Sequence, residues 1–83
     1  MRYFFDVETK YKFITDKIGS EETTLESVRR IAIASLPLIA ADDLPNGDEY
    51  FASVYVRNEN DDRIFTATMN VKANWSHGYP NIQ

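Results

Sequence analysis

The chain has 83 residues, of which 43% are hydrophobic and 27% charged, so it is long enough for one small packed domain and too short for two. It has no cysteine, which excludes a disulfide framework and a cysteine-based zinc site, so its stability must come from packing or from self-association. The formal net charge of −4 argues against a protein whose main role is to neutralise nucleic-acid phosphates.

Two β-rich segments open the chain, at residues 2–8 and 11–16, with a short polar connection at residues 8–10. They predict an antiparallel hairpin. A three-residue loop would place Phe4, Asp6, Lys12 and Ile14 on one face, and Tyr3, Phe5, Val7, Tyr11 and Phe13 on the other.

A helical pattern follows from about residue 25 to residue 43. Thr23 and Glu26 have the spacing of a capping box at its start. Apolar side chains recur with the helical period and predict the buried stripe: Leu25, Val28, Ala32, Leu36 and Ile39, flanked by Ile33 and Ala40. Pro37 lies inside the pattern, where it cannot donate a hydrogen bond to the Ile33 carbonyl, so we expect a kink there.

The acidic pair Asp42 and Asp43 ends the helical pattern, where the helix dipole disfavours negative charge. Two interpretations are open: a site for a cation or a basic partner, or simply a solvated helix end before the break at residues 44–47. We favour the solvated end.

Residues 49–57 and 63–72 alternate again and predict a second hairpin with its turn at residues 58–62. Residues 1–73 then form a single α+β domain, and residues 74–83 an irregular C-terminal tail. The order ββαββ predicts a four-stranded, mainly antiparallel sheet with one kinked helix packed on one face. The other face has no cover unless the tail folds back over it, for example through Trp75.

This uncovered face is the main candidate for binding, because large apolar side chains on an open sheet are typical of protein interfaces. Spare apolar side chains on the outer helix surface add to it. The candidate interface residues are Phe4, Ile14, Phe51, Tyr55 and Ile64 on the sheet, with Ile31 and Leu38 on the helix. They predict a non-enzymatic interaction module that pairs with itself as a homo-oligomer or with another protein.

An alternative is a nucleic-acid-binding or regulatory domain, since aromatic and basic side chains on a sheet can stack bases and contact phosphates. The candidate contacts are Arg2, Lys12, Arg57 and Lys72. Asp6, Glu8 and Asp16 on the same face leave it only slightly basic.

Nothing in the chain has the pattern of a catalytic, metal or cofactor site. The single histidine, His77, lies in the tail between Ser76 and Gly78, where a rigid partner for acid–base chemistry is not expected. The three glycines are isolated and form no phosphate-binding loop. We therefore predict no enzyme activity and no cofactor.

Three short motifs, in their order and spacing, resemble a known family. They are residues 2–7 (RYFFDV), the step from Asp16 and Gly19 into residues 24–26 (TLE), and residues 44–48 (LPNGD). The family consists of short proteins, common in alphaproteobacteria and especially rhizobia, that are catalogued only as a domain of unknown function. The resemblance covers roughly residues 2–72 and departs from the family pattern at Pro37 and in the tail. It implies no activity, ligand or catalytic residue.

The N-terminal sequence lacks the apolar stretch of a signal peptide, and no segment approaches the roughly 20 apolar residues that span a bilayer. These features predict a cytoplasmic protein that does not act at a membrane.

Overall fold

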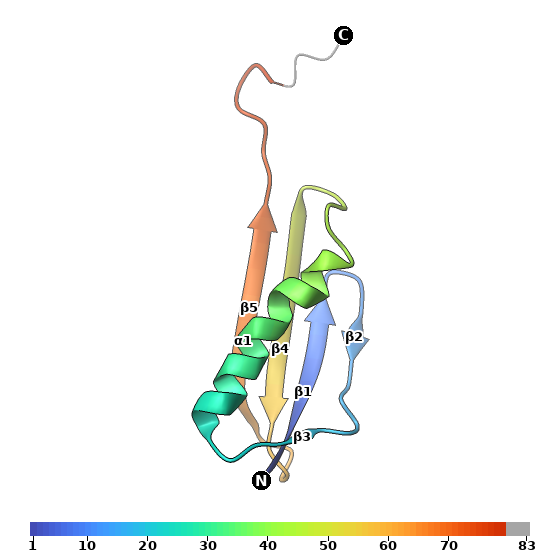
Figure 1. The fold of residues 1–83 in the computed structure, drawn as a ribbon. Helices are drawn as coiled ribbons and strands as arrows, with labels where there is room; N and C mark the ends of the chain where they lie inside the picture. Colours follow the sequence, from blue (N-terminus) through green and yellow to red (C-terminus); the bar gives the residue numbers. More distant parts are fainter. Residues whose placement is uncertain (80–83) are drawn as a thin grey trace.

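The computed structural model describes residues 1–79 and has one α-helix packed against an antiparallel sheet, which confirms the predicted α+β class (Figure 1). The elements are β1 (Arg2–Thr9), β2 (Phe13–Ile14), β3 (Ser20–Glu21), α1 (Leu25–Ala41), β4 (Glu49–Arg57) and β5 (Arg63–Lys72). The described residues contain five strands and not four: β2 is a short strand within the expected segment 11–16, and β3 lies where no strand was expected. The last part of the expected tail, residues 80–83, lies outside the described residues.

The sheet has the strand order β2-β1-β4-β5, and β3 pairs with the first two residues of β1. Every pairing is antiparallel. Between β2 and β3, the Asp16 carboxylate accepts the backbone N–H of Phe5 at 3.0 Å. That side chain therefore replaces a strand partner where the chain arches away from β1.

The first hairpin has a different register from the expected one. Its loop has four residues, 9–12, closed by the Thr9 N–H donating to the Lys12 carbonyl at 2.8 Å. Val7 lies opposite Ile14, and Glu8 opposite Phe13. Directly opposed residues share a face, and this register differs from the expected one by an odd number of residues. Phe13 therefore lies on the open face and Ile14 on the helix side. The assignment of Ile14 to the open face is wrong.

The core lies between α1 and the middle of the sheet. Ala52, Val54 and Val56 of β4 are completely buried, as expected for alternate residues of a central strand covered on one side. The helix contributes its buried stripe at every fourth position: Val28, Ala32, Leu36 and Ala40. Leu25 and Ile33, expected in or beside this stripe, are exposed.

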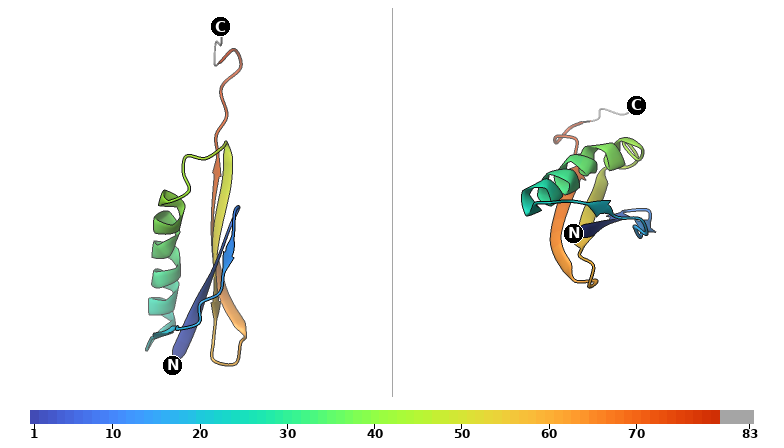
Figure 2. Two further views of the ribbon diagram at one scale, coloured as in Figure 1. Left: turned by 90° about the vertical axis from the view of Figure 1, so that its right-hand side faces the viewer. Right: turned by 60° about the horizontal axis from the view of Figure 1, so that its bottom comes forward.

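The helix begins at Leu25, as expected, but its N-cap is Thr24 and not Thr23; the Thr24 hydroxyl accepts the Ser27 N–H at 3.0 Å. At the other end α1 continues through Pro37 as one helix to Ala41, so the proline does not end it (Figure 2). Pro37 and Ile33 both lie on the exposed side of α1, where water can hydrate the Ile33 carbonyl that loses its donor.

Two layers result, with the helix on one face of the sheet and no helix or strand of residues 1–79 on the other (Figure 2). After Lys72 the chain leaves the end of β5 and extends away from the body, without helix or strand through Tyr79 (Figure 1). Trp75 in this segment is 71% exposed, so it does not cover the open face.

Candidate interaction surfaces

The open sheet face is built from residues that alternate with the core positions. It comprises Phe4, Asp6 and Glu8 of β1, Phe13 of β2, Phe51, Ser53, Tyr55 and Arg57 of β4, and Arg63, Thr66, Thr68, Asn70 and Lys72 of β5. Phe4, Phe51 and Tyr55 lie where the sequence placed them, and all three are half-buried.

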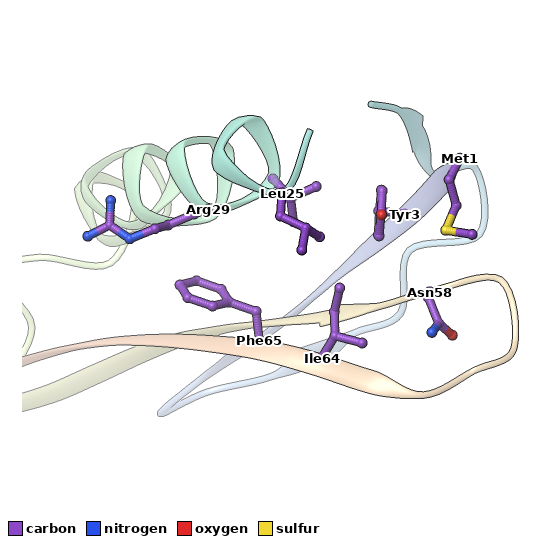
Figure 3. A pocket seen from close by; sticks show the side chains of 8 residues that line it. Met1, Tyr3, Leu25, Arg29, Asn58, Ile64 and Phe65 are labelled. Atoms are coloured by element: carbon purple, nitrogen blue, oxygen red, sulfur yellow. The ribbon is translucent and has the colours of Figure 1, made fainter. Parts of the chain in front are cut away.

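Ile64 does not belong to this face. The register between β4 and β5 shifts at Val56 and Arg57, because Val56 opposes Phe65 while Arg57 opposes Arg63. Ile64 is the extra residue of this bulge, and it points toward the helix side, as Figure 3 shows. The prediction that it lies on the open face is wrong, because alternation counted along the sequence cannot include an unpaired residue.

An aromatic stack occupies the middle of the open face. The rings of Phe13 and Tyr55 lie 6.4 Å apart and nearly parallel, and the Arg63 guanidinium lies 3.9 Å from the centre of the Tyr55 ring. The Tyr55 hydroxyl donates to Glu8 at 2.6 Å. This hydrogen bond raises the pKa of Tyr55. The sequence analysis missed Phe13 here, because the register placed it on the core face.

Arg57 is the centre of a hydrogen-bonded cluster at the end of β4. Its guanidinium donates from Nε to Asp6 at 2.7 Å, from Nη2 to Asp6 at 3.1 Å, from Nη2 to the Asp16 carbonyl at 2.8 Å, and from Nη1 to Asp61 at 2.8 Å. It also lies 4.8 Å above the Phe4 ring. Arg57 therefore links β1, β4 and the segment between β2 and β3, residues 15–19, which we call the arch. This role is structural.

Both carboxylates that hold this arch are stabilised in their charged form. Burial by itself raises the pKa of Asp6, but hydrogen bonds from Arg57 and from the Asp16 N–H, with the charge of Arg57, bring it below its usual value. Burial also raises the pKa of Asp16, and the N–H groups of Phe5, Gly19 and Ile18 lower it overall.

The four basic residues considered for nucleic-acid contacts are not brought together. Arg57 is engaged in its cluster, and Arg2 donates to the Ile18 carbonyl at 2.9 Å. Lys12 lies in the β1–β2 loop and Lys72 at the end of β5, on opposite edges of the sheet. Both side chains are exposed.

The outer surface of α1 carries the remaining candidates. Leu38 is 74% exposed and Ile31 is half-buried. They are single apolar side chains on a helix whose packed stripe faces the sheet, and isolated exposed residues of this kind are normal on protein surfaces.

The free edge of β5 is a stronger candidate that the sequence analysis did not consider. β5 has ten residues and is the last strand of the sheet, so within residues 1–79 only β4 pairs with it. Its charged side chains stand at its two ends, Arg63 and Lys72, with eight uncharged residues between them. Long, uncharged edge strands readily pair with another strand, and proteins usually protect them with charges, proline or a covering element.

A pocket of about 310 Å³ opens at the end of the domain where α1 and β5 begin (Figure 3). It is lined by Met1, Tyr3, Leu25, Val28, Arg29, Asn58, Ile64 and Phe65. Leu25 and Ile64 are 65% and 41% exposed, and both are directed into this space. We call it the end pocket; its walls are mostly apolar.

At the opposite end of α1, Asp43 has a specific structural partner. The Tyr50 hydroxyl donates to Asp43 at 2.6 Å, so this carboxylate anchors the helix end to β4. Asp42 is the C-cap residue of the helix.

Burial, with the hydrogen bond to Asp43, raises the pKa of Tyr50 to about 12. A raised pKa means that Tyr50 contributes stability fully below about pH 10, its value in unfolded chains, and loses it as the pH rises toward 12. Tyr50→Phe is expected to flatten the alkaline loss of unfolding free energy, measured by urea unfolding at increasing pH. Tyr79→Phe, at a tyrosine that is 66% exposed in the segment after β5, is the control and should leave the wild-type slope. Equal slopes for Tyr50→Phe and wild type would contradict the assignment.

These features define a small α+β domain with a one-sided sheet, a free edge strand and an apolar end pocket. Residues 2–70 match the family model described as "Domain of unknown function (DUF6894)", and the chain belongs to this family. No curated protein and no solved structure matches the chain. Among residues 1–79, there is no cluster of three potential metal-ligating His, Cys, Asp or Glu side chains. The helix in that range is neither long nor apolar enough to span a membrane.

Proposed function

We propose that this domain is a non-enzymatic interaction module that self-associates through the free edge of β5. The observation that carries the proposal is the unpaired, uncharged stretch of this ten-residue strand. The N–H and C=O groups on its free edge form hydrogen bonds with a strand of a second copy, whose own β5 has the same free edge.

Antiparallel pairing of β5 with itself satisfies both copies at once, because a two-fold interface joins identical surfaces. With Ala67 on the axis, Thr66 of one copy faces Thr68 of its partner, and Phe65 faces Met69. Phe65, Ala67 and Met69 are half-buried on the helix side. Pairing extends the apolar layer under the two helices.

The open face retains a second role in this arrangement. The two sheets become one, and the stacks of Phe13, Tyr55 and Arg63 lie on the same side of it. The Tyr55 hydroxyl is already bonded to Glu8 within the chain, and the stack lies on the sheet face and not along its free edge. The open face therefore serves as a surface for a later protein partner and not as the dimer contact.

The test is the solution mass of Thr66→Lys/Asn70→Lys, measured by sedimentation over a wide concentration range. Both residues are exposed on the open face, so lysine leaves the folded monomer intact. In the dimer, the added charges of the two copies lie close together and repel. Wild type is expected to reach twice its 9.6 kDa mass, and the variant to remain at 9.6 kDa.

The matched control is Thr15→Lys/Thr23→Lys, which makes the same change in net charge at exposed positions outside β5. It is expected to dimerise like wild type. A monomeric wild type at every concentration would overturn the proposal, and so would an edge variant that dimerises as well as the control.

The nucleic-acid alternative has less support, because two of its four basic residues are engaged within the fold and the other two lie on opposite edges. The absence of enzyme activity, the cytoplasmic location and the alphaproteobacterial origin suggested by the family resemblance stay predictions.

A further inference from the structure

The two ends of β5 carry charges of opposite sign. Lys72 ends the strand; its side chain is exposed and forms no ion pair within residues 1–79, although Glu49 lies opposite it on β4. Asp61 and Asp62 precede the strand, and we call them the acidic corner. The Asn58 N–H donates to the Asp62 carbonyl at 2.9 Å, so Asp62 continues the line of β5 by one residue.

Self-pairing of β5 has only a few possible registers. A two-fold axis perpendicular to the sheet passes through one residue of the strand, and directly opposed residues must have their side chains on the same face. The straight part of β5 runs from the bulge at Ile64 to Lys72, and Ala67 and Thr68 lie in its middle. The registers centred on these two residues differ in what Lys72 meets in the partner.

With Ala67 on the axis, Lys72 of one copy is level with the acidic corner of the other. Counted along the strands, residue 72 lies opposite residue 62 of the partner. The bulge brings Asp61 to the same level, because Arg63, and not residue 64, lies opposite Arg57. The Asp61 carboxylate accepts from Arg57 on the open face, which is also the face of Lys72. Opposed side chains on one face have Cβ atoms about 5 Å apart, well within the reach of a lysine.

The neighbouring registers lack this contact. With Thr68 on the axis, Lys72 is level with the position of residue 64 in a regular strand, which the bulge gives to Arg63. Arg63 lies on the open face, 3.9 Å from the centre of the Tyr55 ring, so two positive charges on one face would oppose each other and destabilise the pair. With Thr66 on the axis, Lys72 passes the acidic corner and reaches residues 59–60, in the turn.

We infer that Lys72 of each copy pairs with the acidic corner of the other copy, and that these two reciprocal contacts set the register of the dimer. This inference rests on the proposed pairing through β5 and names the side chains that make the pairing specific. A single exposed ion pair contributes little stability. Charge complementarity nevertheless fixes the register of an interface, and in a two-fold dimer each contact occurs twice.

Charge reversal tests the contact through the dissociation constant of the dimer, measured by sedimentation at low ionic strength. Lys72→Glu opposes a carboxylate to the acidic corner, and Asp62→Lys opposes a lysine to Lys72. Both positions are exposed, so the folded monomer should remain intact. Each variant is expected to weaken the dimer by about tenfold, because attraction is lost and repulsion gained at both contacts.

The combined variant Asp62→Lys/Lys72→Glu faces opposite charges again and is expected to dimerise within about threefold of wild type. Asp62→Lys/Lys12→Glu is the matched control, because it has the same net charge. Lys12 lies in the β1–β2 loop, at the other edge of the sheet, so this variant should stay as weak as Asp62→Lys alone.

A single introduced cysteine reports the register directly, since the chain has none of its own. With Ala67 on the axis, the two cysteines of Ala67→Cys oppose each other at a distance that a disulfide can span. Those of Thr68→Cys are about 7–8 Å apart along a diagonal, too far for a disulfide. Oxidation with diamide is therefore expected to cross-link Ala67→Cys, and not Thr68→Cys, on a non-reducing gel.

The outcomes separate the two proposals. A wild type that stays monomeric overturns the pairing through β5 and this inference with it. A stable dimer overturns the inference alone, and leaves the pairing standing, if Thr68→Cys cross-links in preference to Ala67→Cys. The same conclusion follows if Asp62→Lys/Lys72→Glu dimerises no better than the Lys12 control.

Discussion

Replacing Asp6 with asparagine is expected to lower the free energy of unfolding by about 2–3 kcal/mol, a large part of the roughly 4–12 kcal/mol available to a domain of this size. Asp6 is only 4% exposed, and its two oxygens accept from Arg57 and from the Asp16 N–H. In asparagine one oxygen becomes an NH₂ group. Either orientation of the amide then points N–H groups at a donor and leaves the guanidinium without its countercharge.

The free energies of unfolding of Asp6→Asn and Asp61→Asn, measured in urea, are to be compared with that of wild type. Both carboxylates pair with the Arg57 guanidinium, so the two variants differ mainly in how deeply the carboxylate is buried. The Asp61 side chain is 83% exposed, so its loss should cost no more than about 0.5 kcal/mol. Equal losses in the two variants would contradict the structural role given to the buried pair.

The same variant should also change the response to acid. The pKa values of Asp6 and Asp16 are lowered in the fold, so the stability that they contribute is complete above the unfolded value, about pH 4, and is lost as the pH falls through the folded values. Wild type should therefore lose stability on acidification, and Asp6→Asn should lose less over the same range.

The parts of the fold that the sequence predicted are those that depend on local periodicity. Alternation predicted the hairpin of residues 49–57 and 63–72, and β4 and β5 have these bounds. The helical period selected Val28, Ala32 and Leu36, and all three are buried. These patterns are strong because each element covers one layer and has one buried side.

The first hairpin shows where periodicity stops being sufficient. Its face assignment depends on the loop length, and one additional residue moves every side chain to the other face. The structure uses the Thr9 side chain to close the longer loop, since its hydroxyl accepts the N–H groups of Tyr11 and Lys12. A threonine at the start of a polar loop is a known turn former, and it was the available signal for this register.

The candidate surfaces depended on contacts between residues far apart in sequence, which no local pattern reports. Arg57 was predicted as a free basic group, whereas its partners lie 51 and 41 residues away at Asp6 and Asp16. The free edge of β5 follows only from the strand order. The sequence left this order open.

Gly19→Ala is expected to cost about 2–4 kcal/mol, because this glycine combines an unfavourable backbone angle with a filled space. Its φ is +74°, and a Cβ atom would lie 2.9 Å from each of three atoms: Arg2 Cγ, Phe4 Cε2 and the Tyr3 carbonyl oxygen. The arginine can move, but the Tyr3 oxygen belongs to β1, and the Phe4 ring is held beneath Arg57. The arch that carries Asp16 would have to shift away from β1, and Asp16 would lose its hydrogen bond from Phe5.

Gly47→Ala isolates the backbone contribution, since Gly47 has a similar φ of +81° but its Cβ would meet only the Lys10 Nζ, at an ordinary contact distance of 3.5 Å. That variant should lose about 1 kcal/mol from strain alone. The difference between the two free energies of unfolding, measured in urea, then reports the tightness of the arch against β1. If Gly19→Ala lost no more than Gly47→Ala, the arch would have to be loose, and the network of Asp6, Asp16 and Arg57 could not hold it tightly against β1.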